Sequence, residues 1–171
     1  QEVETVEYDY GGALGIAVWF GQRKGTASTS DLSPEALKRT VEAACNIAKY
    51  TSEDPCSGIA DPALMVKQVP DLDLYHPQTL DAEHALEQAM ACETAGLEQS
   101  DLIVNSDGAS YNANLGMRVY GNTHGINAGY PSSRYSLSCM VIGSQDNDMQ
   151  RDYAYTVGRQ APLLKSATSI G

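Results

Sequence analysis

Residues 102–130, LIVNSDGASYNANLGMRVYGNTHGINAGY, decide the predicted fold, because glycine, asparagine and aspartate recur in them at short intervals. Turn signals fall at residues 107–108, 114–116, 121–122 and 129. These residue types tolerate the backbone angles of tight turns. Two strand-like runs follow, SLSCMVI (136–142) and RDYAYTV (151–157), joined by the loop GSQDNDM. The second half of the chain therefore predicts an antiparallel β-meander.

The first third of the chain changes from a strand pattern to a helix pattern. EVETVEYDY, ALGIAVWF and RKGTASTS, within residues 2–30, predict three strands. Ser33 then fits a helix N-cap, and Pro34 fits the first helical position, where its missing N–H costs nothing. The helix stripe predicted to face the sheet consists of Leu37, Val41, Ala44, Cys45 and Ala48.

A second helix is predicted to begin near Asp81, after a connection over residues 51–79 that is rich in proline and aspartate. Its predicted buried stripe is Leu86, Ala89, Met90 and Leu97. Strands interrupted by helices predict an α+β fold, an antiparallel sheet meander with helices packed on one face. We expect residues 1–160 to form one N-terminal α+β domain, incomplete at its start, and residues 161–171 to be a linker toward a C-terminal domain.

The charge and the cysteines narrow the class of protein. The net charge is −11 and the 11 basic residues are scattered, whereas a nucleic-acid surface concentrates lysine and arginine on one face. We therefore expect no nucleic-acid partner, and we expect no membrane association, because no apolar run approaches the length of a membrane span. The four cysteines form no C-x-x-C pair, which predicts reduced thiols and a cytoplasmic location.

Local motifs suggest four kinds of chemistry, namely a cysteine nucleophile, a serine–histidine dyad, a metal site and a phosphate loop. Each motif also has a purely structural explanation. Cys56 in EDPCSG is a candidate nucleophile that lacks a histidine placed by the sequence. Ser132 and Ser133 follow Pro131, and a dyad with His124 is conceivable, although small polar residues are ordinary in hairpins. No H-E-x-x-H motif or calcium loop occurs, so PDLDLYHP is read as a solvated acidic loop. The glycine and hydroxyl residues before Ser33 match no phosphate loop. From these motifs taken together, no catalytic or metal-binding residue is predicted.

Polar side chains gather in the hairpin region YGNTHGINAGYPSSRYS instead. Strand edges with short donors and acceptors suit an extended peptide laid beside a strand. The predicted peptide-binding or interface residues are Asn122, His124, Tyr130, Ser132, Ser133 and Arg134. A polar hairpin without a ligand is the alternative.

Several blocks of the sequence resemble one protein family. GQRKGTASTSDLSPEALKRTVEAACNIAKYTSEDPCSGIAD, PDLDLYHP, YGNTHGINAGYPSSRYSLSCMVI and MQRDYAYTVGR are similar to the PmbA (TldE) branch of the TldD/PmbA proteins, also called modulators of DNA gyrase. The similarity runs from about residue 2 to residue 159. The branch often reads S-S-R-H-S where this chain has Tyr135, which weakens any direct binding role for that position.

The resemblance implies a subunit of a cytoplasmic two-subunit zinc metalloprotease that processes or degrades peptides. It implies a TldD-like partner that carries zinc through a helical H-E-x-x-x-H motif, whereas the PmbA branch lacks the motif and helps to close the peptide chamber. This chain would then line the chamber or the subunit interface without catalysing. The alternatives are a module that binds or scaffolds peptides without proteolysis, and an independent hydrolase that uses Cys56 or Ser132 and Ser133.

Overall fold

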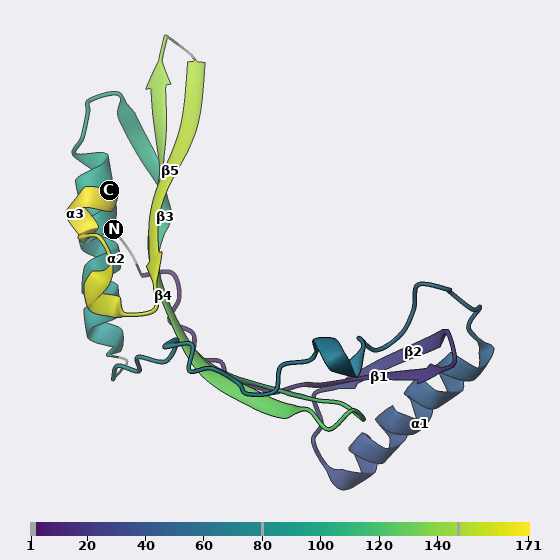
Figure 1. Cartoon of the computed structure of the whole chain (residues 1–171). Coiled ribbons are helices and arrows are strands. Elements are labelled where there is room, and N and C mark those ends of the chain that lie inside the picture. The colour runs from purple at the N-terminus through teal and green to yellow at the C-terminus, as the bar shows by residue number, and fades with distance from the viewer. Residues whose placement is uncertain (1–2, 80, 147) are drawn as a thin grey trace. The chain divides into compact units, whose positions relative to one another are not determined.

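The structure, a computed structural model, describes residues 3–79, 81–146 and 148–171. The chain forms two compact units (Figure 1). The smaller unit spans residues 7–67, and the larger unit comprises residues 68–171 with residues 3–6. Glu2 and Asn147, which belong to the predicted first strand and to a predicted loop, lie outside the described residues.

The smaller unit is a β-hairpin covered by one helix. Strands β1 (Leu14–Phe20) and β2 (Arg23–Thr29) pair antiparallel, and helix α1 (Pro34–Tyr50) packs on them. The predicted start of α1 is confirmed, because the Ser33 side chain accepts a hydrogen bond from the Ala36 N–H and Pro34 occupies the first turn. A short 3₁₀ turn, η1 (Pro62–Leu64), lies in the long connection that follows.

The buried face of α1 differs from the predicted stripe. Ala36, Thr40, Ala44 and Ala48 are buried, whereas Leu37 and Cys45 are half-buried and Val41 is exposed. Gly25 of β2 explains the difference, since a Cβ there would collide with the carbonyl oxygen of Ala44 and the backbone nitrogen of Ala48. The helix approaches the strand through its small residues because neither surface carries a large side chain at the contact.

The predicted first strand does not form. Residues 3–13 have no regular secondary structure, and residues 3–12 are exposed. A strand is stabilised by the hydrogen bonds and side-chain pairs it makes with a neighbour, and no described strand pairs with this segment. The alternating pattern of EVETVEYDY is therefore not sufficient for a strand.

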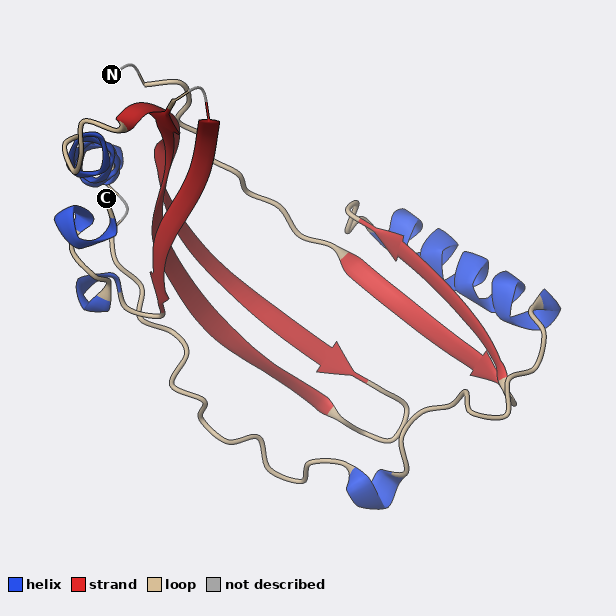
Figure 2. Cartoon of the chain, turned by 90° about the horizontal axis from the view of Figure 1, so that it is seen from above, coloured by secondary structure: helices blue, strands red, loops and turns tan. Residues whose placement is uncertain are grey.

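The larger unit is a three-stranded antiparallel sheet in the order β3-β4-β5, with helices on one face (Figure 2). Its strands are β3 (Ile103–Gly121), β4 (Asn127–Gln145) and β5 (Asp148–Gly158), and helix α2 (Ala82–Leu97) precedes them. The α+β fold with an antiparallel sheet is thus confirmed. No helix in the described part of the chain is long and apolar enough to cross a lipid bilayer.

Strand β3 runs through two of the predicted turns. Gly108 has a φ of +101°, and the pairing with β4 shifts register between Ser106 and Gly108, so this turn signal marks a β-bulge. Residues 114–116 continue the strand without a break. The hairpin turns only after Gly121, where Gly125 has a φ of +87°. Since β4 ends at Gln145 and β5 begins at Asp148, the next loop is also shorter than predicted.

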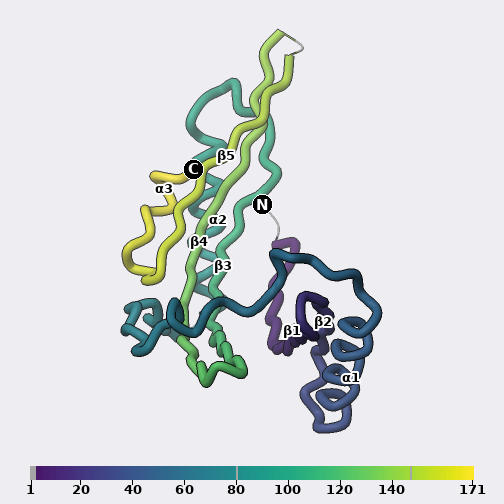
Figure 3. Tube along the Cα trace, turned by 45° about the vertical axis from the view of Figure 1, so that its right-hand side comes forward, coloured from purple at the N-terminus to yellow at the C-terminus, as the bar shows by residue number. Residues whose placement is uncertain are grey.

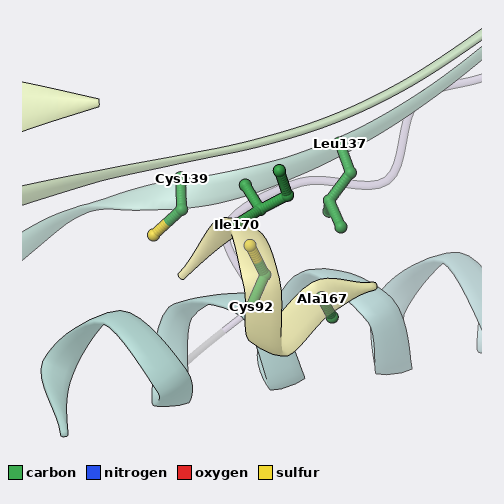
Figure 4. Packing of buried hydrophobic residues seen from close by; sticks show 5 residues of the cluster. All are labelled: Cys92, Leu137, Cys139, Ala167 and Ile170. Atoms are coloured by element: carbon green, nitrogen blue, oxygen red, sulfur yellow. The ribbon is translucent and has the colours of Figure 1, made fainter. Parts of the chain in front are cut away.

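The core of the larger unit lies between α2 and the sheet (Figure 4). Its buried members are Cys92, Leu137, Cys139, Ala167 and Ile170. Ala167 and Ile170 belong to α3 (Ala167–Ile170), which follows the 3₁₀ turn η2 (Ala161–Leu163). Residues 161–171, predicted as a linker, therefore pack against α2 and β4, because their apolar residues complete this core. The domain boundary predicted at residue 160 stays a prediction.

The predicted buried stripe of α2 is only partly correct. Cys92 and Gly96 are the buried residues of the helix, Leu86, Ala89 and Leu97 are half-buried, and Met90 is 40% exposed. Gly96 lets the helix approach the sheet, because a Cβ there would lie 3.0 Å from a methyl carbon of Val141.

Candidate functional site

The predicted site residues lie on the β3–β4 hairpin, where strand alternation divides them between two faces. Opposite residues in the register share a face, and Arg118 pairs with Tyr130, Gly116 with Ser132, and Asn114 with Arg134. We call this side of the hairpin the open face, defined by Asn114, Gly116, Arg118, Tyr130, Ser132 and Arg134. Ser133 and Tyr135 point to the opposite side, which is also the side of the core residues Leu137 and Cys139.

Residues 68–79, which we call the strap, run beside the β3–β4 hairpin (Figure 3). Ser133 of β4 is fully buried and is hydrogen-bonded to this strap. Its N–H donates to the carbonyl oxygen of Leu74 (2.8 Å), and its hydroxyl oxygen accepts from the N–H of His76 (2.9 Å). The hydroxyl also donates to the carbonyl oxygen of Arg159 (2.7 Å), whose guanidinium returns a bond to the Ser133 carbonyl (2.9 Å). With no exposed surface, Ser133 offers nothing to a peptide in this structure.

Tyr135 forms hydrogen bonds with the next part of the strap. Its side chain is 1% exposed, and its hydroxyl accepts from the N–H of Gln78 (3.0 Å) and donates to the carbonyl oxygen of His76 (3.1 Å). Tyr135 is therefore a buried partner of the strap. Sequence reasoning did not assign this function, because the strap is 57 to 59 residues away in the chain.

Asn122 and His124 lie in the turn of the hairpin. The Asn122 side-chain oxygen accepts from the N–H of His124 (3.0 Å) and of Ile126 (3.3 Å), so Asn122 shapes the turn. His124 is exposed. Ser132 lies five residues into β4 from Asn127, about 16 Å from the turn at roughly 3.3 Å per residue. The structure does not bring His124 and the two serines together as a dyad.

The open face carries two arginines from neighbouring strands, Arg118 and Arg134, both exposed. The ion pairs among the described residues join Arg23 to Glu53, His76 to Asp73 and Arg151 to Asp107. Neither open-face arginine is in an ion pair with a described carboxylate. Sequence reasoning selected Arg134, Tyr130 and Ser132 but missed Arg118, which only the strand register places beside them.

The four cysteines comprise an exposed one, the half-buried Cys45 and a buried pair. Cys56 is exposed in the smaller unit, which contains none of the three histidines of the chain. Cys92 and Cys139 are buried in the core of the larger unit. Desolvation raises the pKa of the Cys92 thiol to about 11 and also raises the pKa of Cys139. Both buried thiols stay protonated near neutral pH and are poor nucleophiles.

Metal-binding side chains do not cluster in the described part of the chain, where no group of three histidine, cysteine, aspartate or glutamate residues could hold an ion. In PDLDLYHP, Asp71 accepts from the N–H of Asp73 (3.0 Å), and the Asp73 carboxylate lies 3.4 Å from the His76 ring. These side chains organise the strap, so the residues described here do not fit a zinc site.

One cavity of the larger unit lies away from the predicted site, between the sheet, α2 and residues 161–166. It has a volume of about 370 Å³ and is lined by His84, Tyr111, Lys165 and seven other residues. The rings of His84 and Tyr111 meet edge to face with centroids 6.5 Å apart. None of the six predicted site residues lines this cavity.

The larger unit defines the class of an α+β domain built on a long antiparallel hairpin, with the described helices of that unit packed on one face of its sheet (Figure 2). Comparisons with known proteins narrow this class to one family. Residues 75–170 match the model of the PmbA/TldA metallopeptidase central domain, and residues 1–48 match the model of PmbA/TldA metallopeptidase domain 1. The chain therefore belongs to the PmbA/TldD metallopeptidase family.

Individual relatives agree with this assignment. The chain is 52% identical over its whole length to the metalloprotease PmbA homolog of Haemophilus influenzae, and 49% identical over 99% of its length to metalloprotease PmbA of Escherichia coli O157:H7. It spans 38% of the length of each of these relatives.

Solved structures share the fold. A Bacteroides thetaiotaomicron protein named for modulation of DNA gyrase aligns with a TM-score of 0.81 at 22% identity, covering 92% of this chain and 38% of its own. TldE from Thermococcus kodakarensis aligns with a TM-score of 0.70 at 18% identity, covering 94% and 36%.

Proposed function

We propose that this chain is the N-terminal part of a PmbA/TldE-like subunit in a two-subunit zinc metalloprotease that processes or degrades peptides. In this proposal a TldD-like partner supplies the zinc, and the described residues line the peptide chamber or the subunit interface without catalysing. The names of the relatives, metalloprotease PmbA and TldE, support the proposal. The assembly acts in the cytoplasm, which fits cysteines that are all free thiols.

The observation that carries the proposal is the contrast between the two sides of the β3–β4 hairpin. On one side Ser133 and Tyr135 are committed to the strap, and Cys139 is buried in the core with Cys92. On the open face, exposed arginines and small polar residues form a surface suited to binding rather than to bond breaking. General acid–base catalysis needs a titratable group within hydrogen-bond reach of the reacting atoms. The six residues that define the open face include no histidine, aspartate, glutamate, lysine or cysteine, and the Tyr130 hydroxyl there forms no hydrogen bond to a described residue that would prepare it for proton transfer.

The test is a cleavage assay with the full-length protein and a TldD-like protein. Each alone and the two together are incubated with an unstructured, fluorescently labelled peptide. We expect cleavage that depends on the mixture and stops when a zinc chelator is added. Absence of cleavage by the mixture under conditions where the two proteins co-elute would contradict the proposal.

The open face also supports a second candidate function, peptide binding or scaffolding without proteolysis. Exposed arginines bind a carboxylate-bearing segment whether or not it is later cleaved. This alternative predicts peptide affinity that is unchanged by the partner and no partner-dependent product. The same mixture separates the two functions, since only the metalloprotease subunit yields shortened peptides.

A further inference from the structure

The open face carries an arrangement of charge that the proposed function leaves undefined. Arg118 lies opposite Tyr130, and Arg134 lies opposite Asn114, four residues along β3 from Arg118. At roughly 3.3 Å per residue, four residues of a strand span about 13 Å. Along the strand direction, the backbone positions of the two arginines therefore match side chains four residues apart on an extended segment.

The sheet surface between the two arginines carries only small side chains. Gly116 and Ser132 pair there, and a Cβ built on Gly116 would meet no atom within 4 Å. Side chains of an extended segment beside β3 can reach across the face at this point without displacing a large side chain. The hydroxyl of Ser132 and the amide of Asn114 provide hydrogen-bonding groups on the same face.

The free edge of β3 is an independent observation that points to an extended ligand. Among the described strands β3 pairs only with β4, so one edge of a 19-residue strand has no strand partner. Such an edge presents backbone N–H and C=O groups and is a template for strand addition. Side chains of an added strand would alternate, and every second one would lie on the open face.

The charge of the open face indicates which side chains the bound segment carries. The chain has a net charge of −11, and yet the open face presents two arginines that no described carboxylate neutralises. Arg23 and Arg151, by contrast, are in ion pairs within the fold, with Glu53 and Asp107. Guanidinium groups bind carboxylates through charge-assisted hydrogen bonds.

We infer that the open face binds an extended acidic peptide, added as a strand to β3, whose carboxylates four residues apart reach Arg118 and Arg134. This inference rests on the proposed function and names its substrate class. The carboxylate that reaches Arg134 must extend across Asn114, because adjacent strands lie about 4.8 Å apart. Glutamate suits that reach better than the shorter aspartate.

The test is the affinity of the full-length protein for labelled dodecapeptides, measured by fluorescence anisotropy at low salt. One peptide carries two glutamates four residues apart, a second carries glutamines there, and a third carries glutamates five residues apart. We expect the first peptide to bind tightest. The second should bind about 10-fold more weakly, because it lacks both carboxylates, and the third about 3- to 5-fold more weakly, because it points one carboxylate to the wrong face. Equal affinity for all three peptides would overturn the inference.

Variants locate the site. R118Q and R134Q should each weaken binding of the first peptide by about 3- to 5-fold, as expected for one exposed ion pair. R39Q is the matched control, because Arg39 is an exposed arginine on α1 in the smaller unit. If R39Q weakens binding as much as R118Q, general charge attraction replaces the registered site.

Failure of this inference is distinguishable from failure of the proposed function. If the glutamine peptide binds and is cleaved in the mixture as well as the glutamate peptide, the acidic preference is wrong and the protease subunit stands. If the glutamate peptide binds in register and no mixture cleaves it, the metalloprotease proposal fails and the binding site stands.

Discussion

The hydroxyl of Tyr135 donates a hydrogen bond to the carbonyl oxygen of His76, which lies 59 residues earlier in the chain, at an O···O distance of 3.1 Å. The same hydroxyl accepts from the N–H of Gln78, so one side chain satisfies two backbone groups of the strap. Ser133 satisfies two more, at Leu74 and His76. The strap is thus held on β4 by one backbone hydrogen bond, from the Ser133 N–H, and by side-chain hydrogen bonds from Ser133 and Tyr135.

Replacement of Tyr135 by phenylalanine should destabilise the strap. The change removes the partner of the His76 carbonyl and of the Gln78 N–H, both part-buried, and the loss of such a hydrogen bond costs about 0.5–1.5 kcal/mol. Hydrogen exchange at Gln78 should accelerate by about 2- to 10-fold, while exchange in α1 stays unchanged. Y155F is the control, because Tyr155 is 60% exposed on β5. Equal protection of Gln78 in Y135F and in the parent would show that the hydroxyl does not hold the strap.

Replacement of Ser133 by alanine should cost more than replacement of its neighbour Ser132. The Ser133 hydroxyl bonds to His76 and Arg159 in a fully buried site, so its loss should lower the free energy of unfolding by about 1–3 kcal/mol. S132A, on the open face, should stay within about 0.5 kcal/mol of the parent. Urea unfolding followed by far-UV circular dichroism measures both. A serine-directed fluorophosphonate probe should label neither serine, because Ser133 is buried and Ser132 has no histidine beside it to activate its hydroxyl.

Replacement of Gly25 by alanine should destabilise the smaller unit. The added Cβ would collide with the backbone of Ala44 and Ala48, which cannot rotate away as a side chain can. Overpacking of this kind costs about 1–3 kcal/mol. Trp19, the single tryptophan of the 171 residues, lies in β1 and reports on this unit by its fluorescence. G15A is the control, since a Cβ at Gly15 meets nothing within 4 Å. Coincident unfolding curves for G25A and the parent would contradict the close contact.

The buried thiols should make the larger unit less stable at alkaline pH. Burial raises the pKa of Cys92 from 9.0 to about 11, so the folded state favours the protonated thiol. The unfolded state releases its proton first, near pH 9, and the stability contributed by the thiol is therefore lost as pH rises from about 9 to about 11. C92A, which removes the titrating group, should flatten this part of the pH profile in urea melts. At pH 8, iodoacetamide should label Cys56 and spare Cys92 and Cys139 until urea is added.

Short sequence motifs correctly predicted the elements that depend on interactions between neighbouring residues. Ser33 and Pro34 set the start of α1, and Asp81 caps α2 through the N–H of Glu83, because capping depends on neighbours within one turn. The signal at residues 107–108 was misread, since a glycine with positive φ serves a bulge as well as a turn. The predictions of which helix faces are buried were less accurate, because the contact of Gly25 with α1 depends on tertiary packing.

Only part of the candidate site could be predicted, because local patterns are visible in the sequence and long-range contacts are not. Tyr130, Ser132 and Arg134 alternate along one strand, and their common face could be read from the sequence. Arg118 joins them only through the register of β3 against β4. The burial of Ser133 depends on a strap almost 60 residues away, and no periodicity in the sequence reports such a contact.

Elemental analysis of the full-length protein purified without a partner, combined with its turnover of an unstructured peptide, tests the non-catalytic role most directly. We expect far less than one zinc per chain and no shortened peptide, with both zinc and products appearing when the TldD-like partner is added. One tightly held zinc per chain together with cleavage by the isolated protein would contradict that role.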